Sequence, residues 1–275
     1  MDQAPRCVAI HDLSGFGRCS LTIVLPVLSA MGVQCCPLPT AYLSTHTGGF
    51  TGNTFLDMTG PMEAAAAHWA ALGLHFQAIY SGFMSSRRQL EDAPALIRSL
   101  RREDTLVLTD PVMGDNGQTY RTYTPEMCAA AVSLAAEADV ITPNLTEAAV
   151  LLGIPYGEAL ALPPEEAVRR LSLEGRRSVV LTGVSRREGV IGAACLDRRE
   201  GVVRFAEAER VPGSFHGTGD LFASVLTGHL LRGRSLGEAA EGAAEFVSAC
   251  VKRTLALGTP AREGVDFEPL LKLLF

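Results

Sequence analysis

The sequence contains very few lysines. Among 275 residues only Lys252 and Lys272 are lysines, and both lie in the last stretch of the chain, away from any glycine-rich turn. A Walker A loop needs a Gly-Lys-Ser/Thr segment, so the chain nearly excludes that phosphate-binding motif. A Schiff-base enzyme is disfavoured as well, because its nucleophilic amine would have to come from one of these two side chains.

Cysteine pairs with metal-ligand spacing are also missing. The seven cysteines are an odd number and include no C-x-x-C pair, so they indicate neither a zinc site nor a disulfide framework. We interpret them as reduced thiols that mostly pack in the interior.

The composition and the first residues exclude further classes. With 47% hydrophobic residues, 20% charged residues and a net charge of -6, the chain fits neither a disordered segment nor a nucleic-acid surface. Small ligands, including metal-chelated ones, are expected instead. Residues 1–10 hold one arginine and a short apolar run, which fits neither a signal peptide nor a membrane anchor. We therefore expect a cytoplasmic protein without a membrane partner.

Short β-branched runs alternate with amphipathic or alanine-rich segments, which is typical of an α/β fold. We predict one domain over residues 1–275, with a mainly parallel central sheet and helices on both faces. A charged turn at 198–200 joins residues 189–197 and 201–207, which predicts an antiparallel hairpin at one edge. The other predicted strands are 7–10, 76–80, 105–109, 140–142 and 178–182, and the predicted helices are 20–31, 62–72, 87–101, 125–137, 165–173, 221–231 and 236–255.

The best single functional signal is the segment Gly-Thr-Gly-Asp at residues 217–220, directly before an apolar helix. A helix start with two glycines exposes backbone N–H groups at the positive end of the helix dipole, which suits a phosphoryl group in transfer. Asp220 can then accept the proton of an attacking hydroxyl. The alternative is an acidic residue that only favours a helix N-terminus.

Acidic residues follow two further predicted strands. Asp110 and Asp115 come after the strand 105–109, where the ligand crevice of an open parallel sheet lies, and they suit a hydrated Mg²⁺ ion. An Asp-Pro turn without function explains the same residues. Asn144 and Glu147 follow the strand 140–142 as a capping box, which is compatible with Glu147 also reaching the water shell of a metal.

Three other segments are candidates for ligand contacts. Residues 179–183 end a buried strand with Thr-Gly, where a polyphosphate could approach the backbone, although a plain strand end explains them equally well. Residues 10–17 and 43–52 follow the first two strands and are rich in glycine and small hydroxyls. A planar polar ligand could contact them, although a lone histidine in a turn such as His46 is usually structural or solvated. The candidate contacts there are Asp12, Ser14, His46 and Thr47.

Taken together and in this order, the segments resemble the pyridoxal and pyridoxamine kinases of the ribokinase superfamily. They resemble in particular the bacterial form that carries H-D-x-S-G-F-G-R-C-S and S-T-H-T-G-G-F-T-G. The resemblance covers nearly the whole chain through five ordered motifs. It implies a ribokinase-like fold, a homodimer, and transfer of the γ-phosphate of ATP to the 5'-hydroxymethyl group of pyridoxamine, pyridoxal or pyridoxine in vitamin B6 salvage.

The resemblance also implies roles for individual residues. Mg²⁺ would assist ATP, with a monovalent cation as a further candidate. The implied catalytic set is Gly217, Thr218 and Gly219 as anion hole and Asp220 as base. The implied metal-organising set is Asp110, Asp115 and Glu147. The implied ATP-binding set is Asn144, Thr182, Gly183 and Ser185. The implied B6-binding set is Asp12, Ser14, His46, Thr47 and Phe83, under a lid of residues 45–52.

Two positions depart from the animal-type pattern, which has serine where this chain has Asp12 and usually tyrosine where it has Phe83. Asp12 resembles the hydroxymethylpyrimidine kinase branch, so that activity is the alternative within enzymes. As a further hypothesis, the Asp12 carboxylate pairs with the 4'-ammonium of pyridoxamine, which would favour pyridoxamine over pyridoxal. A non-catalytic B6-binding protein is the alternative of another class, but a binder needs no base beside an anion hole.

Overall fold

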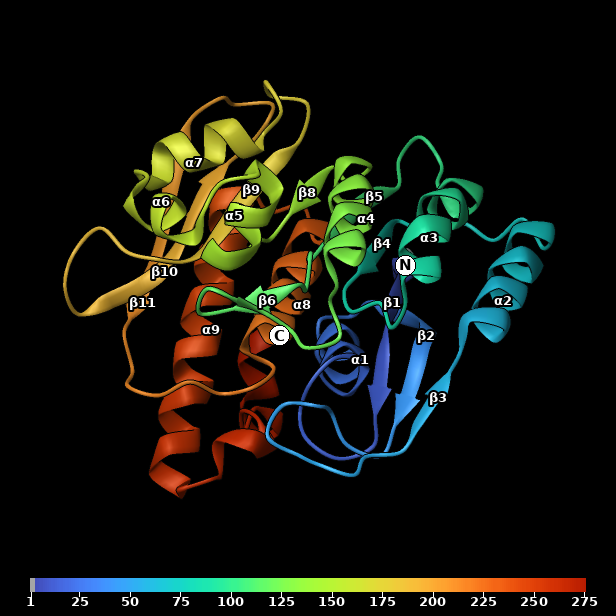
Figure 1. Ribbon diagram of the computed structural model, residues 1–275, viewed down its shortest axis with the longest axis horizontal. Coiled ribbons are helices and arrows are strands. Elements are labelled where there is room, and N and C mark those ends of the chain that lie inside the picture. The colour runs from blue at the N-terminus through green and yellow to red at the C-terminus, as the bar shows by residue number, and fades with distance from the viewer. Residues whose placement is uncertain (1–2) are drawn as a thin grey trace.

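The computed structural model describes residues 3–275, and its centre is a nine-stranded sheet in the order β11-β10-β9-β8-β5-β4-β1-β2-β3 (Figure 1). The six strands from β9 to β2 in this order pair in parallel, and the strands at both edges are antiparallel. The predicted α/β fold with a mainly parallel sheet is therefore confirmed.

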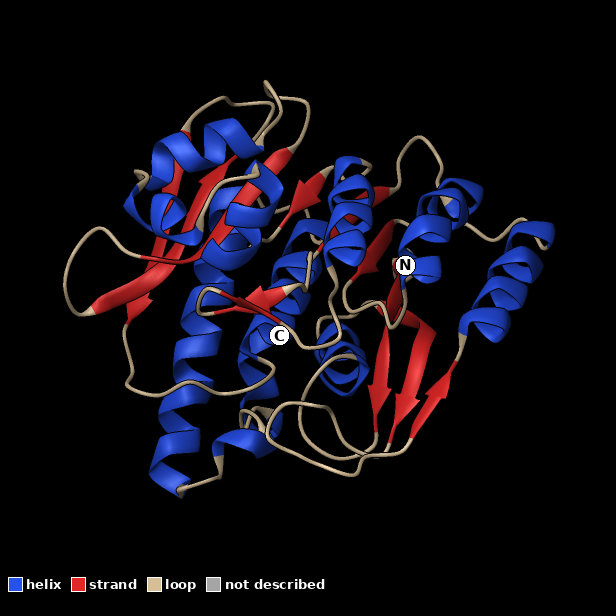
Figure 2. Cartoon of the chain, in the orientation of Figure 1, coloured by secondary structure: helices blue, strands red, loops and turns tan. Residues whose placement is uncertain are grey.

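The strands and helices alternate along the chain (Figure 2). The strands are β1 Arg6–Ser14, β2 Gln34–Leu43, β3 Phe55–Asp57, β4 Ala78–Ser81, β5 Leu106–Thr109, β6 Gly114–Asp115, β7 Gln118–Thr119, β8 Val140–Ile141, β9 Ser178–Val184, β10 Val190–Leu196 and β11 Val203–Glu209. The α-helices are α1 Leu21–Ala30, α2 Thr59–Ala71, α3 Arg87–Leu100, α4 Pro125–Ala136, α5 Leu145–Leu152, α6 Tyr156–Ala161, α7 Pro164–Leu171, α8 Thr218–Leu231 and α9 Leu236–Leu257, followed by the 3-10 helices η1 Ala261–Glu263 and η2 Glu268–Leu274.

Two apolar layers hold the helices on the sheet. Cys7 and Ala9 of β1 face the layer formed with α1, α8 and α9, whereas Val8 and Ile10 face the layer formed with α2, α3, α4 and α7. This alternation within one strand follows from the period of two along a β-strand. All four side chains are fully buried, as expected for a parallel strand covered on both faces.

The edges of the sheet differ partly from expectation. The predicted hairpin is present as β10 and β11, with Leu196 opposite Val203 next to its turn. At the other edge, the short strand β3 pairs antiparallel with β2, and a separate hairpin of β6 and β7 follows β5. Neither was predicted. The residues of β3 are all exposed, so no alternation of buried and exposed positions marks them.

The first strand is longer than predicted, and this difference matters for function. We expected it to end at Ile10, with the polar segment in a following loop. Instead β1 continues to Ser14, because β2 pairs with it as far as Ser14 opposite Leu43. The register shifts between His11 and Leu13, an irregularity that changes how side chains point along a strand. Asp12 and its neighbours are therefore held by the sheet.

Within residues 3–275 no helix is both long enough and apolar enough to cross a membrane. The prediction of one domain over residues 1–275 stays a prediction, and residues 1 and 2 lie outside the described residues.

Candidate active site

The candidate site lies where the parallel strands end. Asp110 follows β5 and Asn144 follows β8, while His11 and Asp12 occupy the last part of β1. Because these strands run parallel, their carboxyl ends meet at one side of the sheet, and an open α/β sheet binds ligands at that side. The segments that follow β1, β5 and β8, which the sequence indicated as candidates, therefore lie together at the carboxyl ends of the strands.

The N-terminus of α8 contributes backbone amides to this edge. Gly217 precedes the helix with φ 81°, a left-handed conformation that glycine adopts without cost. A Cβ atom at this position would overlap the carbonyl oxygen of Arg18, so the close approach also requires glycine. Amides in a first helical turn have no carbonyl one turn earlier to bond, and they attract anions. The start of α8 thus has the backbone geometry that an anion hole needs, and its role as an anion hole stays a prediction.

Asp220 lies in the first turn of α8, as predicted, and both of its carboxylate oxygens have partners. Oδ1 lies 3.0 Å from Nε2 of His11, and Oδ2 accepts a hydrogen bond of 2.8 Å from the backbone N–H of Ser20. The side chain is 13% exposed, so it is enclosed but still reachable. The carboxylate is held in one orientation from two sides.

Ser20 adopts a strained backbone to make this contact. Its φ is 52° and its ψ is -135°, although it is not glycine. Such a conformation costs on the order of 1–3 kcal/mol and persists only where surrounding structure enforces it. The N–H of this strained residue bonds to the carboxylate of Asp220. We therefore interpret the strain as the cost of orienting that side chain.

Buried acidic groups crowd the same region. Burial raises the pKa of Asp110 well above its usual value, and the charges of Glu147 and Asp220 raise it further. Burial also raises the pKa of Glu147 to about 7, against three backbone hydrogen bonds that lower it. The charge of Asp110 is thus disfavoured by burial and by two neighbouring carboxyl groups, which makes this region attractive to a cation.

Glu147 is fixed by the backbone. It completes the predicted capping box of α5, with its Oε2 accepting from the N–H of Asn144 at 2.8 Å. Its Oε1 accepts from the N–H of Met113 at 3.0 Å, and the Asn144 side chain donates to the carbonyl of Gly114 at 2.8 Å. The capping box therefore also attaches the start of α5 to the segment that leads into β6.

The donor chemistry of these residues suits a hydrated divalent ion. Asp110, Asp115 and Glu147 offer carboxylate oxygens, which hard cations such as Mg²⁺ prefer. Within the described ranges, no three histidine, cysteine or acidic side chains are close enough to hold a bare ion. Asp115 is exposed, and both of its oxygens accept hydrogen bonds from Asn116. These three carboxylates therefore fit an ion that keeps its water ligands, contacts the protein through them and is bound directly by the phosphates of a nucleotide.

The predicted ATP-binding residues beyond Asn144 lie at the end of β9. Gly183 has φ 76° and would have open space around an added Cβ, so its backbone is accessible. Thr182 donates a hydrogen bond from its N–H to the carbonyl of Pro143, at 2.9 Å, which keeps β9 next to the start of α5. Ser185 follows the strand and is half-buried.

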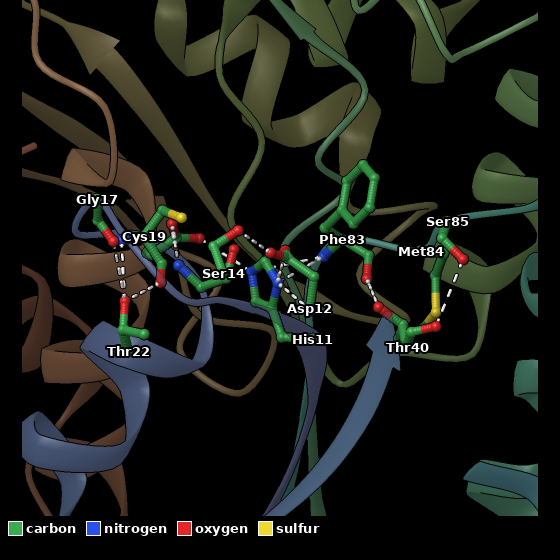
Figure 3. A network of polar contacts seen from close by, with 12 residues as sticks. His11, Asp12, Ser14, Gly17, Cys19, Thr22, Thr40, Phe83, Met84 and Ser85 are labelled. Atoms are coloured by element: carbon green, nitrogen blue, oxygen red, sulfur yellow. Dashed lines mark hydrogen bonds and ion pairs between the residues drawn. The ribbon is translucent and has the colours of Figure 1, made fainter. Parts of the chain in front are cut away.

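On the acceptor side, the residues predicted to bind the substrate ring occupy β1 and the segment after β4 (Figure 3). Asp12 is buried, and its Oδ2 accepts from the hydroxyl of Ser14 at 2.8 Å. Its Oδ1 lies 3.1 Å from Nδ1 of His11. Phe83 is half-buried and packs at 6.2 Å from the ring of Tyr123. Asp12 is thus already engaged with two neighbours from its own strand.

The loop between β2 and β3 contains the other two predicted contacts. His46 is buried, and its Nδ1 accepts from the N–H of Gly48 at 3.1 Å, so its Nε2 carries the hydrogen that is donated to the carbonyl of Arg262 at 2.7 Å. Both ring nitrogens of His46 are therefore bound to backbone. Thr47 beside it is exposed. The loop also packs on His216, next to the start of α8, at 4.8 Å between the rings of His46 and His216.

Two residues that contact Asp220 were not among the predicted site residues, namely His11 and Ser20. His11 lies in the N-terminal motif at residues 10–17, but a single histidine in a sequence does not indicate a partner 209 positions away. The contact of Ser20 is made by its backbone, which no side-chain pattern can reveal. Their only sequence signal is their place in a motif at the end of the first strand.

Comparison with known proteins agrees with this geometry. Residues 25–264 match the family model for phosphomethylpyrimidine kinase. A pyridoxine/pyridoxal/pyridoxamine kinase from Bordetella avium is 29% identical over 255 residues, covering 87% of this chain and 82% of its own.

Two solved structures are similar over nearly their whole length. A protein from Bacteroides thetaiotaomicron, assigned as a phosphomethylpyrimidine kinase and crystallised in an orthorhombic form with pyridoxal, is 39% identical with a TM-score of 0.90, covering 98% of this chain and 96% of its own. Pyridoxal kinase from Lactobacillus plantarum is 35% identical with a TM-score of 0.90, covering 99% and 97%. Because the family match spans most of the sequence, the chain belongs to the phosphomethylpyrimidine kinase family.

Proposed function

We propose that this protein is a kinase that transfers the γ-phosphate of ATP to the 5'-hydroxymethyl group of a B6 vitamer. The observation that carries the proposal is the start of α8, where Asp220 is oriented by two hydrogen bonds beside the amides that follow Gly217. Relatives named for pyridoxal and pyridoxine, and a similar structure with pyridoxal, support the acceptor class.

The residues of the chain divide the chemistry among them. Asp220 accepts the proton of the acceptor hydroxyl while the hydroxyl oxygen attacks the γ-phosphorus of ATP, the bond from that phosphorus to the β-phosphate oxygen breaks, and ADP leaves. The amides of residues 217–219 stabilise charge on the phosphoryl group in transfer. Little covalent assistance is needed, since the transition state of phosphoryl transfer is loose and positioning dominates. Asn144, Thr182, Gly183 and Ser185 would contact ATP, and Asp12, Ser14, His46, Thr47 and Phe83 would surround the acceptor.

We propose Mg²⁺ as the cation that accompanies ATP. Asp110, Asp115 and Glu147 would hold its water shell, and the ion would supply charge neutralisation for the phosphates. The crowding of buried carboxyl groups around Asp110 supports this assignment.

The proposed function predicts the outcome of an acceptor panel. Purified protein is incubated with Mg·ATP and either pyridoxine, pyridoxal, pyridoxamine or hydroxymethylpyrimidine, and the phosphorylated products are measured by mass spectrometry. We expect at least one B6 vitamer to have a higher kcat/KM than hydroxymethylpyrimidine. A preference for hydroxymethylpyrimidine, after which the matching family model is named, would assign the alternative kinase activity. Tight vitamer binding without turnover would indicate the non-catalytic binder.

We further propose a homodimer in the cytoplasm. The free state of all seven cysteines is compatible with a reducing compartment such as the cytoplasm.

Exposed apolar side chains of the outer strand β3 support a dimer interface, because Phe55 and Leu56 are 53% and 58% exposed. We expect the protein to sediment as a dimer in analytical ultracentrifugation and Leu56→Glu to shift it toward monomer. A monomeric wild type would remove this part of the proposal.

A further inference from the structure

The orientation of Asp220 depends on a side chain from the other end of the chain. His11 Nε2 lies 3.0 Å from Asp220 Oδ1, and His11 is only 2% exposed. An ionised carboxylate can only accept hydrogen bonds, so Nε2 must carry a hydrogen for this contact to be favourable. Both the neutral tautomer with hydrogen on Nε2 and the imidazolium meet that requirement. The donor role of Nε2 therefore holds in either protonation state.

His11 is itself held on its other side. Its Nδ1 lies 3.1 Å from Asp12 Oδ1, and the hydroxyl of Ser14 donates to the second oxygen of Asp12. Burial alone would lower the pKa of His11, but the charges and hydrogen bonds of Asp220 and Asp12 outweigh it and raise this pKa to about 10. The two carboxylates therefore favour a ring with hydrogen on Nε2, whereas Nδ1 also faces the backbone N–H of Asp12 at 3.0 Å.

The surrounding chain packs closely around the imidazole of His11. Gly82 follows β4 directly beside β1, and a Cβ atom there would overlap the His11 ring. Tyr80 packs edge-on at 6.2 Å from the ring, and the backbone N–H of Phe83 points at its Nδ1 at 3.3 Å. Figure 3 shows His11 beside Asp12, with dashed contacts toward Phe83. The ring has one defined position.

We propose that His11 is a positioning residue for phosphoryl transfer, which fixes the carboxylate of Asp220 toward the acceptor hydroxyl through its Nε2–H donor. This inference rests on the proposed function, in which Asp220 is the base. The Ser20 N–H occupies the second oxygen of Asp220, and each oxygen retains a further lone pair for the substrate. In this reaction the position of the base matters more than its strength.

Two isosteric variants separate this role from packing. The amide nitrogen of His11→Gln takes the place of Nε2 and keeps a donor toward Asp220, whereas that of His11→Asn takes the place of Nδ1 and reaches only Asp12. We expect His11→Asn to lower kcat at saturating Mg·ATP and vitamer by roughly 10- to 100-fold, the scale of a misplaced catalytic group. The acceptor KM should change far less, and His11→Gln should recover most of the lost kcat. Equal kcat values in the two variants would overturn the proposal.

A matched control is His75, which also pairs with a carboxylate, Asp104 at 2.8 Å, but at an exposed site. His75→Asn should leave kcat unchanged.

A second measurement does not depend on activity. In protein labelled with ¹⁵N-histidine, the His11 signals are assigned by their loss in His11→Gln. We expect Nε2 of His11 to be protonated in the wild type and its signal to shift in Asp220→Asn. An unprotonated Nε2, or no shift, would refute the contact. If the wild type phosphorylates no acceptor while this contact is observed, the proposed function fails and the assignment of His11 as the partner of Asp220 stands.

Discussion

Replacing Asp220 by asparagine should lower kcat by about 10²- to 10⁴-fold, the range that one positioned general base contributes. Asparagine keeps the size of the side chain and an oxygen that can accept the hydrogen bond of 2.8 Å from Ser20 N–H. It cannot accept a proton from the acceptor hydroxyl at neutral pH. The KM values for ATP and vitamer should therefore change little. Steady-state kinetics of product formation, with the unfolding midpoint recorded for both proteins, measures the effect.

A control for this substitution is Glu238, which occupies the same first-turn position in α9 and is exposed. Glu238→Gln removes an acidic group near a helix N-terminus without touching the candidate site. It should retain the wild-type kcat. If Asp220→Asn lost vitamer affinity as strongly as kcat, Asp220 would be a structural residue and another group would have to act as base.

The second large effect is expected at Gly217. Alanine there must adopt φ 81°, which costs about 1–2 kcal/mol, and its Cβ would also overlap the carbonyl of Arg18. Relief of that overlap requires the start of α8 to move away from the loop before α1. The amides next to Gly217 would then no longer face the phosphoryl group. We expect Gly217→Ala to reduce kcat at least as much as the loss of one anion-hole donor, about 10²- to 10³-fold.

Gly233 provides the comparison for Gly217. It also has a left-handed backbone, with φ 80°, but an added Cβ would meet open space. Gly233→Ala should lower the unfolding midpoint through backbone strain alone and retain the kcat of the folded protein. Similar kcat values for the two alanine variants would show that the close approach at Gly217 has no catalytic consequence.

The sequence predicted those parts of the fold that depend on local patterns. Asn144 and Glu147 form the predicted capping box because both partners lie within one helical turn. The first turn of α8 was predicted for the same reason, since glycines and an acidic residue mark a helix start. Assignment of the predicted site residues to ATP, acceptor and metal stays a prediction, although several of them meet at one end of the sheet.

What the sequence could not predict depends on distant partners. The last residues of β1, from His11 to Ser14, do not form a strongly apolar run, and they become strand through pairing with β2. The same pairing sets where His11 lies relative to α8. The need for glycine at position 82 could not be predicted either, because a Cβ atom there is excluded only by the ring of His11, which lies beside it in the fold. Contacts across more than 200 residues leave no periodic trace in a single sequence.

The connected side chains Asp12, His11 and Asp220 also bear on how this protein could diverge. Asp12 adjoins the expected acceptor pocket, and the same carboxylate supports the histidine that orients the base. A substitution selected for a new acceptor at Asp12 would therefore carry a cost in turnover, and its effect should be non-additive with one at His11. A change of acceptor specificity should therefore occur more readily when Asp12 and His11 are replaced together than when either is replaced alone. Acceptor selectivity and turnover rate would then change as one property.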